Sequence, residues 1–342
     1  MEKNIKKVNI GQLKYLNDIH YKNIITLVKL FFYSFFLIFI SMKKETVQLI
    51  KNKLFNIFPE HKYKFFSCFC GIARNENLYA RELIEYYINI GVDKFYLGDH
   101  NLVNTEKLID VLRDYVDTGN VEIIDLIGKP KYKKRQTDFY AYVYEKHKYE
   151  CNWMLFFDFD EFLFFTDKNT TKIKQFLSEE KFKKCDTIKI NWLIYDDNDL
   201  VYYDNRSIIK RFTRPDYKNA HNIFVKSILR GNINEPIWSI NGSPHTPNRY
   251  KSNCDSLGIR HKKSTFINKY NYTVSYIRHY RTKTIEEFAY KTLRGYPDKK
   301  VNYTERLDFF FKNNKFTKEK LAVYKKILNI SDNKNKKIKK NF

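Results

Sequence analysis

The stretch Leu155-Phe156-Phe157-Asp158-Phe159-Asp160-Glu161-Phe162-Leu163-Phe164-Phe165 places three carboxylates inside an apolar run. An unpaired carboxylate taken out of water costs on the order of several kcal/mol, so these acids need counter-charges. In an extended segment Asp158 and Asp160 lie on one face, about 7 Å apart. A divalent cation such as Mn²⁺ or Mg²⁺ would satisfy both, because such ions prefer oxygen ligands and usually hold phosphates as well. The alternative is an acidic strand end that caps a turn, since Asp-x-Asp alone is a weak motif.

Apolar strands and amphipathic helices alternate in the residues before this stretch. The pattern predicts strands over residues 65–73, 94–97, 121–124 and 153–157, and helices over residues 76–90, 106–118 and about 136–150. The first helix carries its apolar residues on one face and stops at Gly91; those residues are Ala80, Leu83, Ile84, Tyr87 and Ile88. A βαβαβαβ order predicts an α/β fold with a mostly parallel sheet covered by helices.

Polar residues follow each of these strands. In parallel sheets, ligands bind beyond the carboxyl ends of the strands, so these residues are expected to share one edge. They are Arg74, Asn75 and Glu76 after the first strand, Asp99, His100 and Asn101 after the second, Asp125 after the third, and Asp158 to Glu161 after the fourth. The sequence therefore predicts a nucleotide-sized cleft with a metal on one side.

Several blocks of sequence resemble a known family. They include Ile72-Ala73-Arg74-Asn75-Glu76, residues 85–96, Asp99-His100-Asn101, Gln136, Trp153, residues 158–163, Lys226-Ser227-Ile228-Leu229-Arg230, residues 278–288 and Lys291-Thr292-Leu293-Arg294-Gly295. In this order they resemble glycosyltransferase family 92 and its bacterial relatives in the family 2-like group. The resemblance implies a GT-A fold, which is the Rossmann-like fold of nucleotide-diphospho-sugar transferases. It also implies metal-dependent transfer of a sugar, of the hexosyltransferase type, from a nucleotide-diphosphate sugar to a glycan, lipid-linked or surface-polysaccharide acceptor.

The resemblance and the chemistry of the reaction together assign roles to single residues. Cleavage of a sugar–phosphate bond builds negative charge on the leaving diphosphate, which a metal stabilises. We expect Asp160 to ligate the metal directly and Asp158 to reach it through water or the ribose. In many GT-A enzymes a histidine completes the metal shell, and here His279 or His245 would do so.

Further residues are expected on the donor and acceptor sides. Arg74, Asn75 and Glu76 belong to the donor side, and Asp99 is expected to bind the nucleobase or ribose. Arg230 and Arg281 would pair with the donor's phosphates, unless they are solvated surface cations. Asp196 or Asp197, after a strand from Thr187 to Ile190, would be the base that deprotonates an acceptor hydroxyl. The alternative is a turn, which a run of Asp and Asn also favours.

Length and composition limit the possible domain organisation. The 342 residues, 43% hydrophobic and 17% aromatic, predict one catalytic domain over residues 61–300. A basic leader over residues 1–60 precedes it, and a helical basic tail over residues 301–342 follows it. The net charge of +24 would suit nucleic acid or an anionic membrane surface as a partner. No nucleic-acid-binding motif supports the first, so we expect a membrane surface and no nucleic acid.

The leader holds an apolar segment, Ile24 to Met42, which would be about 28 Å long as a helix and would nearly span a bilayer. A docking helix is the alternative, as is an extension that falls away if translation starts at Met42. We expect a membrane-associated protein with a cytoplasmic catalytic domain, or a cytoplasmic protein if Met42 is the start. The five cysteines fit neither a disulfide framework nor a zinc site, which favours a reducing compartment.

Two other classes of function remain open on the sequence. A nucleotidyltransferase, or another metal-dependent enzyme that uses nucleotides, would share the acids and the cleft but not the block over residues 278–295. A catalytically silent protein that binds only sugar or membrane would keep the fold without the reaction.

Overall fold

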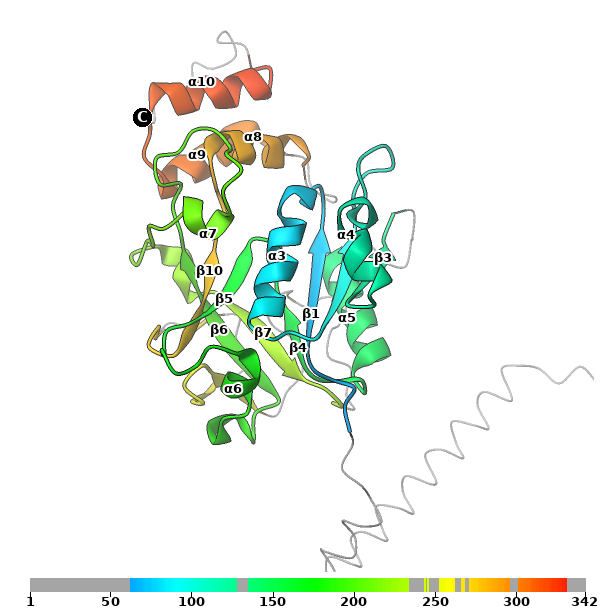
Figure 1. Cartoon of the computed structure of the whole chain (residues 1–342). Coiled ribbons are helices and arrows are strands. Elements are labelled where there is room, and N and C mark those ends of the chain that lie inside the picture. Colours follow the sequence, from blue (N-terminus) through cyan, green and yellow to red (C-terminus); the bar gives the residue numbers. More distant parts are fainter. Residues whose placement is uncertain are drawn as a thin grey trace, which may run out of the picture. The chain divides into compact units, whose positions relative to one another are not determined.

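The computed structural model describes residues 62–127, 135–233, 243, 245, 252–261, 266–267, 271–295 and 301–330. Strands and helices alternate in its first half, as the sequence predicted (Figure 1). They are β1 Phe65–Ala73, α3 Asn77–Asn89, β2 Lys94–Asp99, α4 Leu108–Asp117, β3 Val121–Asp125, α5 Arg135–His147 and β4 Cys151–Phe156. The four strands pair in the order β3-β2-β1-β4, and every pair is parallel. Their carboxyl ends therefore share one edge of the sheet.

The second half extends the same sheet with strands of mixed direction. Its elements are β5 Glu161–Phe165, α6 Ile173–Leu177, η1 Glu180–Phe182, β6 Thr187–Ile194, α7 Ile208–Arg211, η2 Ala220–Ile223, β7 Val225–Arg230, β8 Asn253–Asp255, β9 Arg260–His261 and β10 Ser275–His279. The sheet order is β3-β2-β1-β4-β7-β6-β10-β5, with β8 paired to β6 and β9 paired to β8. Strand β7 is antiparallel to β4 and β6, β5 is antiparallel to β10, and β9 is antiparallel to β8. The other strand pairs are parallel, which confirms the predicted α/β class with a mostly parallel sheet.

Alternating side chains of β1 build a core on each face of the sheet. Phe69 packs with the buried face of α3, whereas Cys68 and Cys70 point to the opposite face, toward α5. Helix α3 buries Ala80, Leu83, Ile84 and Tyr87. Ile88 was predicted on that face but lies in the last turn and is 38% exposed. Gly91, at φ +94°, ends the helix as predicted.

Three helices close the C-terminal part of the described chain: α8 Ile285–Leu293, α9 Tyr303–Asn313 and α10 Lys318–Ile327. Apolar side chains of α9 and α10 pack on Phe288 of α8 and form a separate core cluster. Figure 1 shows the three helices together at one end of the molecule. Lys320 of α10 also forms a fully buried ion pair with Asp197, at 2.5 Å. The described part of the tail is therefore packed onto the domain and holds α8 from outside.

The cysteine prediction was wrong, because four of the five cysteines form disulfides. Cys68 pairs with Cys151 and Cys185 with Cys254, while Cys70 is free and buried. The partners are 83 and 69 residues apart, and strand pairing brings them together: β1 lies beside β4, and β8 lies beside β6. Spacing along the sequence does not reveal such contacts. The cysteines therefore no longer support the prediction of a reducing compartment.

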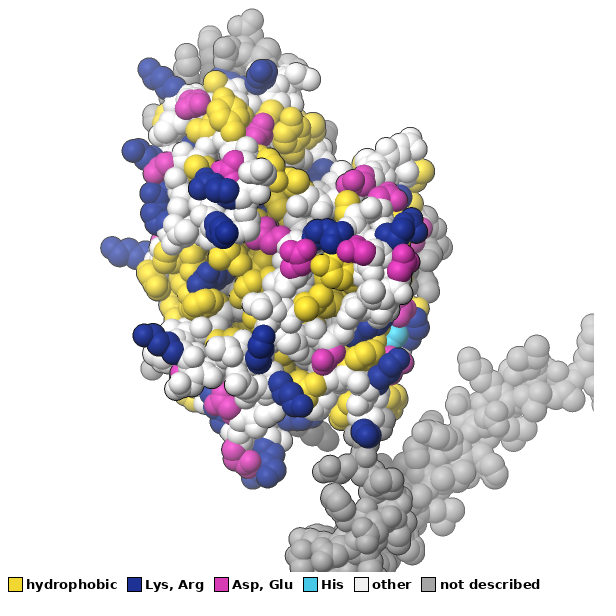
Figure 2. Space-filling model, in the orientation of Figure 1, with side chains coloured by type: hydrophobic (Ala, Val, Ile, Leu, Met, Phe, Trp, Pro, Cys, Tyr) yellow, Lys and Arg dark blue, Asp and Glu magenta, His cyan; other side chains and the backbone are white. Residues whose placement is uncertain are grey.

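Membrane association rests on residues outside the described part. The segment from Ile24 to Met42 and the rest of the leader lie there. Within the described ranges, no helix has both the length and the apolar character needed to cross a bilayer. Figure 2 shows Lys and Arg side chains scattered over the visible face, interspersed with acidic and apolar ones. On this face the positive net charge is dispersed and does not form a single patch.

We predict that the paired variant Cys68→Ala/Cys151→Ala unfolds with a free energy about 2–4 kcal/mol lower than the wild type, because the bridge closes a long loop. Denaturant unfolding with and without dithiothreitol measures this. The matched control is Cys70→Ala, whose buried thiol has no disulfide partner. It should leave the response to the reductant unchanged. A wild type that is indifferent to dithiothreitol would contradict the bridges.

Candidate active site

Asp158 lies just beyond β4 and is neutralised by a buried lysine. Its Oδ2 is 2.8 Å from Nζ of Lys226, and its Oδ1 accepts a hydrogen bond from Nε2 of Gln136 at 2.5 Å. Strand β7 supplies the lysine because Ser227 pairs with Phe156 across the sheet. Burial acts to lower the pKa of Lys226, but the carboxylates of Asp158 and Glu161 outweigh it and raise that pKa. Lys226 is therefore a permanent cation in the interior.

Glu161 is the buried third acid of the motif. One carboxyl oxygen accepts the backbone N–H of Asp158 at 2.9 Å and lies 3.5 Å from Nζ of Lys226. The other has no hydrogen-bond partner among the described residues. Burial raises the pKa of Glu161 well above its ordinary value, and the charges of Asp158 and Asp160 add to this rise, although Lys226 opposes it. Glu161 fixes the turn through its hydrogen bond to the backbone of Asp158.

Asp160 has two lysines and a histidine from the C-terminal part as neighbours. Nζ of Lys291 is 2.7 Å from its Oδ2, Nζ of Lys283 is 3.9 Å from the same oxygen, and Nε2 of His279 is 3.5 Å from Oδ1. Burial would raise the pKa of Asp160, but Lys291, His279 and Lys283 hold it well below its ordinary range. Pairing of β5 with β10 sets this geometry, because His279 stands opposite Glu161. Asp160 is therefore ionised and surrounded by positive charge.

The start of helix α8 fixes where these lysines lie. Thr284 caps the helix and shares a capping box with Glu287. Glu287 also binds Nη1 of Arg211 at 2.7 Å and the hydroxyl of Tyr79 at 2.6 Å, which anchors α8 to α7 and α3. Lys291 follows one turn later on the same face. Lys283 precedes the cap with φ +57°, a conformation that a long side chain adopts only when its surroundings require it.

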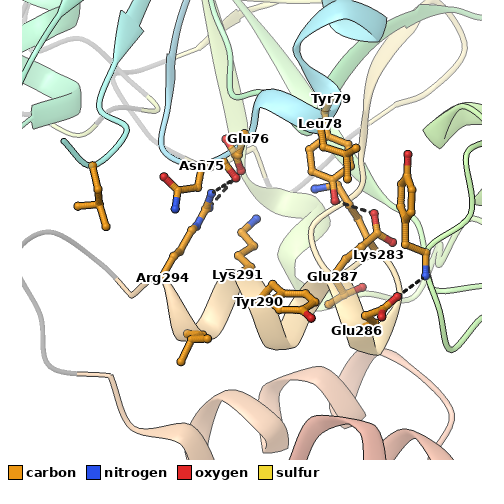
Figure 3. Close-up of a pocket in the computed structure, with 14 residues that line it drawn as sticks. Asn75, Glu76, Leu78, Tyr79, Lys283, Glu286, Glu287, Tyr290, Lys291 and Arg294 are labelled. Carbon is orange, nitrogen blue, oxygen red and sulfur yellow. Dashed lines mark hydrogen bonds and ion pairs between the residues drawn. The ribbon is translucent and has the colours of Figure 1, made fainter. Parts of the chain in front are cut away.

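A pocket of about 650 Å³ opens between α8 and the loop after β1. Figure 3 shows Lys291 and Arg294 projecting from α8 toward that loop. Asn75 and Glu76, both predicted on the donor side, line it together with Lys283 and Lys291. Its remaining lining residues are Leu78, Tyr79, Leu102, Tyr203, Thr282, Glu286, Glu287, Tyr290, Leu293 and Arg294. The pocket is large enough for a nucleotide-sized ligand.

The loop after β1 is clamped by Arg294. Its guanidinium binds the carbonyl oxygens of Arg74 and Asn75 and lies 3.1 Å from a carboxylate oxygen of Glu76. Asn75 has φ +51°, and its N–H donates to Oδ1 of Asn101. Arg74 is not among the residues that line the pocket. Two of the three residues predicted in this loop therefore face the pocket.

Asp99 is 3% exposed and both of its carboxylate oxygens are occupied. They accept the backbone N–H groups of Asn101 at 2.8 Å and Leu108 at 2.9 Å. The side chain thus holds the loop after β2 and the first turn of α4. Since Asn101 binds Asn75, Asp99 supports the pocket wall and does not face it.

The two predicted arginines lie in different places. Arg230 ends β7 opposite Trp153, about 16 Å from the acid motif along β4, because β7 runs antiparallel to β4. Its guanidinium binds the carbonyls of Phe182 and Cys185, so the structure does not bring it to the site. Arg281 is near the site. Its carbonyl lies 3.5 Å from Nζ of Lys291, while its guanidinium covers the ring of Phe309.

The two predicted acceptor-side acids are both ion-paired. Oδ2 of Asp196 is 2.6 Å from Nε of Arg214. Its Oδ1 accepts the N–H of Asn198, which is typical of a turn built from Asp and Asn residues. Asp197 is fully buried with Lys320. A fully buried carboxylate cannot reach an acceptor hydroxyl.

Both candidate histidines pack on Trp192, with ring centroids 4.3 Å away for His279 and 5.1 Å for His245. Burial lowers the pKa of His279, and it lowers that of His245 to about 3, so both rings are neutral and able to ligate a metal. Only His279 has an ion-pair contact with Asp160. Its Nδ1 has no hydrogen-bond partner among the described residues.

The residues that the structure describes include no group of three His, Cys, Asp or Glu side chains that could hold a metal ion. Asp160 and His279 nevertheless offer two ligands of suitable chemistry beside the pocket. Ions that hold phosphates commonly take only one or two carboxylates from the protein and complete their shell with the substrate. The residues therefore fit a divalent cation that binds together with a phosphate group.

Sequence reasoning assigned no role to the lysines that neutralise the motif. Lys226, Lys283 and Lys291 all lie in the blocks that carry the family resemblance. The signal that could have identified them is charge balance, because buried carboxylates require cations and these blocks supply them.

Comparison with known proteins gives the family. The sequence model of glycosyltransferase family 92 matches residues 63–338, so the chain belongs to this family. A family 92 protein of Arabidopsis thaliana is 29% identical over 107 residues, which are 29% of this chain and 16% of that protein. One of Oryza sativa subsp. japonica is 28% identical over 103 residues, 30% of this chain and 17% of that protein. The chain thus matches only about a sixth of the length of these relatives.

A solved structure is also similar in part. It is the mannosyltransferase PcManGT from Pyrobaculum calidifontis in complex with GDP-Man and Mn²⁺. The sequence identity is 9% and the TM-score 0.26, over 39% of this chain and 37% of that one. A likeness this small carries no argument about the chemistry of the present site.

We predict that the free energy of unfolding of Glu161→Gln rises relative to that of the wild type as the pH rises. In the unfolded chain Glu161 loses its proton near its ordinary pKa, whereas the folded protein keeps it to higher pH. The folded state then binds more protons, so the stability due to this group falls as the pH rises through that interval. Urea unfolding of both proteins from about pH 4 to pH 8 measures the difference. A difference that does not change with pH would contradict the raised pKa of Glu161.

Proposed function

We propose that the protein is a glycosyltransferase that uses a nucleotide-diphosphate sugar together with Mn²⁺ or Mg²⁺. One observation carries this proposal: the pocket of about 650 Å³ is lined by Lys283 and Lys291, and both lie beside Asp160 of the acid motif. Membership of glycosyltransferase family 92 supports the transfer of a sugar. The donor would lie in the pocket with its diphosphate toward these lysines.

Each part of the site has a role in this reaction. Asp160 and His279 would hold the cation, which neutralises the charge that develops on the leaving diphosphate. Asp158, fixed by Lys226 and Gln136, would contact the bound cation through water or bind the ribose. The dipeptide Asn75-Glu76 would contact the nucleoside. Asp99 would affect nucleoside binding indirectly, because it holds Asn101, which in turn binds Asn75.

The acceptor side has fewer supporting contacts. Burial of Asp197 leaves Asp196 as the candidate base, and its pairing with Arg214 would have to open for proton transfer. Arg281, next to Lys291, is the remaining arginine candidate for a phosphate contact. We keep a hexosyl donor and a glycan, lipid-linked or surface-polysaccharide acceptor as the proposed substrates, with a membrane surface as a partner through the leader.

The decisive experiment measures hydrolysis of UDP- and GDP-sugars by the full chain with Mn²⁺, with Mg²⁺ and with EDTA. Metal-stimulated release of free sugar and nucleoside diphosphate supports the proposal. Release of nucleoside monophosphate or pyrophosphate would instead indicate a nucleotidyltransferase or related enzyme. Binding of a sugar nucleotide without turnover, even with oligosaccharide acceptors present, would indicate a silent binding protein.

We predict that Asp160→Asn lowers hydrolysis and transfer to below about 1% of the wild type, because removal of a ligand charge weakens stabilisation of the leaving group. The variant should remain folded, since asparagine keeps the shape of the side chain. Steady-state kinetics and thermal unfolding together test this. Asp114→Asn is the matched control, as Asp114 forms an exposed pair with Arg81 and neither residue lines the pocket. A folded, fully active Asp160→Asn protein would exclude the proposed metal site.

We predict that His279→Ala weakens Mn²⁺ binding in the presence of UDP or GDP by about tenfold or more, whereas His245→Ala changes it little. The reason is that only His279 reaches Asp160, although both rings pack on Trp192. Electron paramagnetic resonance of free Mn²⁺ measures both affinities. The opposite ranking of the two variants would transfer the ligand role to His245.

A further inference from the structure

The charged side chains that line and adjoin the pocket are unevenly paired. Among its acidic residues, Glu76 is bound by Arg294 and Glu287 by Arg211, while Glu286 accepts the N–H of Tyr203. Two further cations line the pocket, and their carboxylate partner is Asp160, which the two ammonium groups share. At Asp160, two positive charges therefore meet one negative charge, whereas the carboxylate of Glu286 lies near Tyr203. A local excess of positive charge favours an anionic group at this side of the pocket.

The two lysines differ in their freedom to move. Lys283 is 3% exposed, and its ammonium lies over the ring of Tyr79 at 4.3 Å. The side chain of Lys291 is 22% exposed and projects from the pocket-facing side of α8 (Figure 3). Its ammonium lies 2.7 Å from Asp160, and its flexible four-carbon stem allows the charge to turn from that carboxylate into the pocket.

The position that Lys291 occupies is also the position that a ligated cation would need. A divalent cation ligated by Oδ2 of Asp160 would lie against the ammonium of Lys291 at 2.7 Å from that oxygen, closer than the ammonium of Lys283 at 3.9 Å, and would repel it strongly. Binding of a divalent cation to Asp160 therefore requires Lys291 to leave. The departing ammonium then needs another anion.

We propose that Lys291 is an exchangeable counter-ion of Asp160. In the empty protein it neutralises the carboxylate; when donor and divalent cation bind, it releases Asp160 and pairs with the donor's diphosphate. This inference rests on the proposed function and adds a coupling to it. The diphosphate and the cation assist each other's binding, because each gives one member of the Lys291–Asp160 pair a new partner.

The test measures Mn²⁺ affinity of the full chain by electron paramagnetic resonance, first without nucleotide and then with saturating UDP or GDP. In Lys291→Met, the nucleotide-free protein should bind Mn²⁺ about tenfold more tightly than the wild type, because the competing cation is gone. Calorimetry should show weaker binding of UDP or GDP. The improvement in Mn²⁺ affinity on adding nucleotide should shrink by a similar factor.

Two further variants separate this exchange from a general effect of charge. Lys291→Arg keeps the cation and, without nucleotide, should bind Mn²⁺ no more tightly than the wild type does. Lys183→Met removes an exposed lysine whose ion pair with Glu180 lies outside the pocket, and should change neither affinity. Thermal unfolding verifies that each variant is folded.

The outcomes distinguish the exchange from the proposed function. Unchanged or weaker Mn²⁺ binding by nucleotide-free Lys291→Met, or no binding by either protein, would overturn the exchange and leave the lysine as a structural ion pair. Mn²⁺ binding that appears only in the variant would support it. Because this measurement contains no sugar nucleotide, it is independent of hydrolysis by the wild type, which alone decides whether the protein is a glycosyltransferase.

Discussion

Neutralisation of the acid motif beyond β4 is the constraint on which the rest of the structure depends. Asp158 and Asp160 remain ionised in the interior only because lysines from β7 and from the segment around α8 reach them. Removing such a partner would leave an uncompensated charge, a cost of about 3–5 kcal/mol in comparable buried pairs. The motif therefore links the parallel half of the sheet, which carries it, to the C-terminal half, which supplies its counter-charges. The fold and the site share this link.

The helices after residue 284 help to build the site, although they lie near the end of the chain. Helix α8 carries Lys291 and Arg294, which contact the acid motif and the loop after β1. Its opposite face is covered by α9 and α10, and the buried Asp197–Lys320 pair fixes α10 to the loop after β6. The tail therefore controls how firmly one wall of the pocket is held. A site formed this way depends on packing far from the substrate.

Local sequence pattern predicted the first half of the fold. The alternation of buried strands and amphipathic helices gave β1 to β4, and the embedded acids led us to expect a site at the carboxyl ends of these strands. The misses involve contacts between distant segments. Arg230 belongs to a sequence block that follows the acid motif in the family resemblance. Strand β7 nevertheless runs antiparallel to β4 and places Arg230 at the end of β4 opposite to the motif. The disulfides and the lysine counter-ions likewise depend on contacts between segments 68 or more residues apart, which periodicity does not encode.

The division of labour between arginine and lysine in the pocket follows from their chemistry. Arg294 uses its planar fork to hold two backbone carbonyls and Glu76 at once, and a group with three partners in fixed directions is suited to clamp a loop. Lys291 has its one carboxylate partner in Asp160, through a compact charge on a flexible stem. Lys291 can therefore exchange that partner with little change in its geometry. An arginine at position 291 would keep the charge, but its two-pronged hold on Asp160 would be harder to release to an incoming cation.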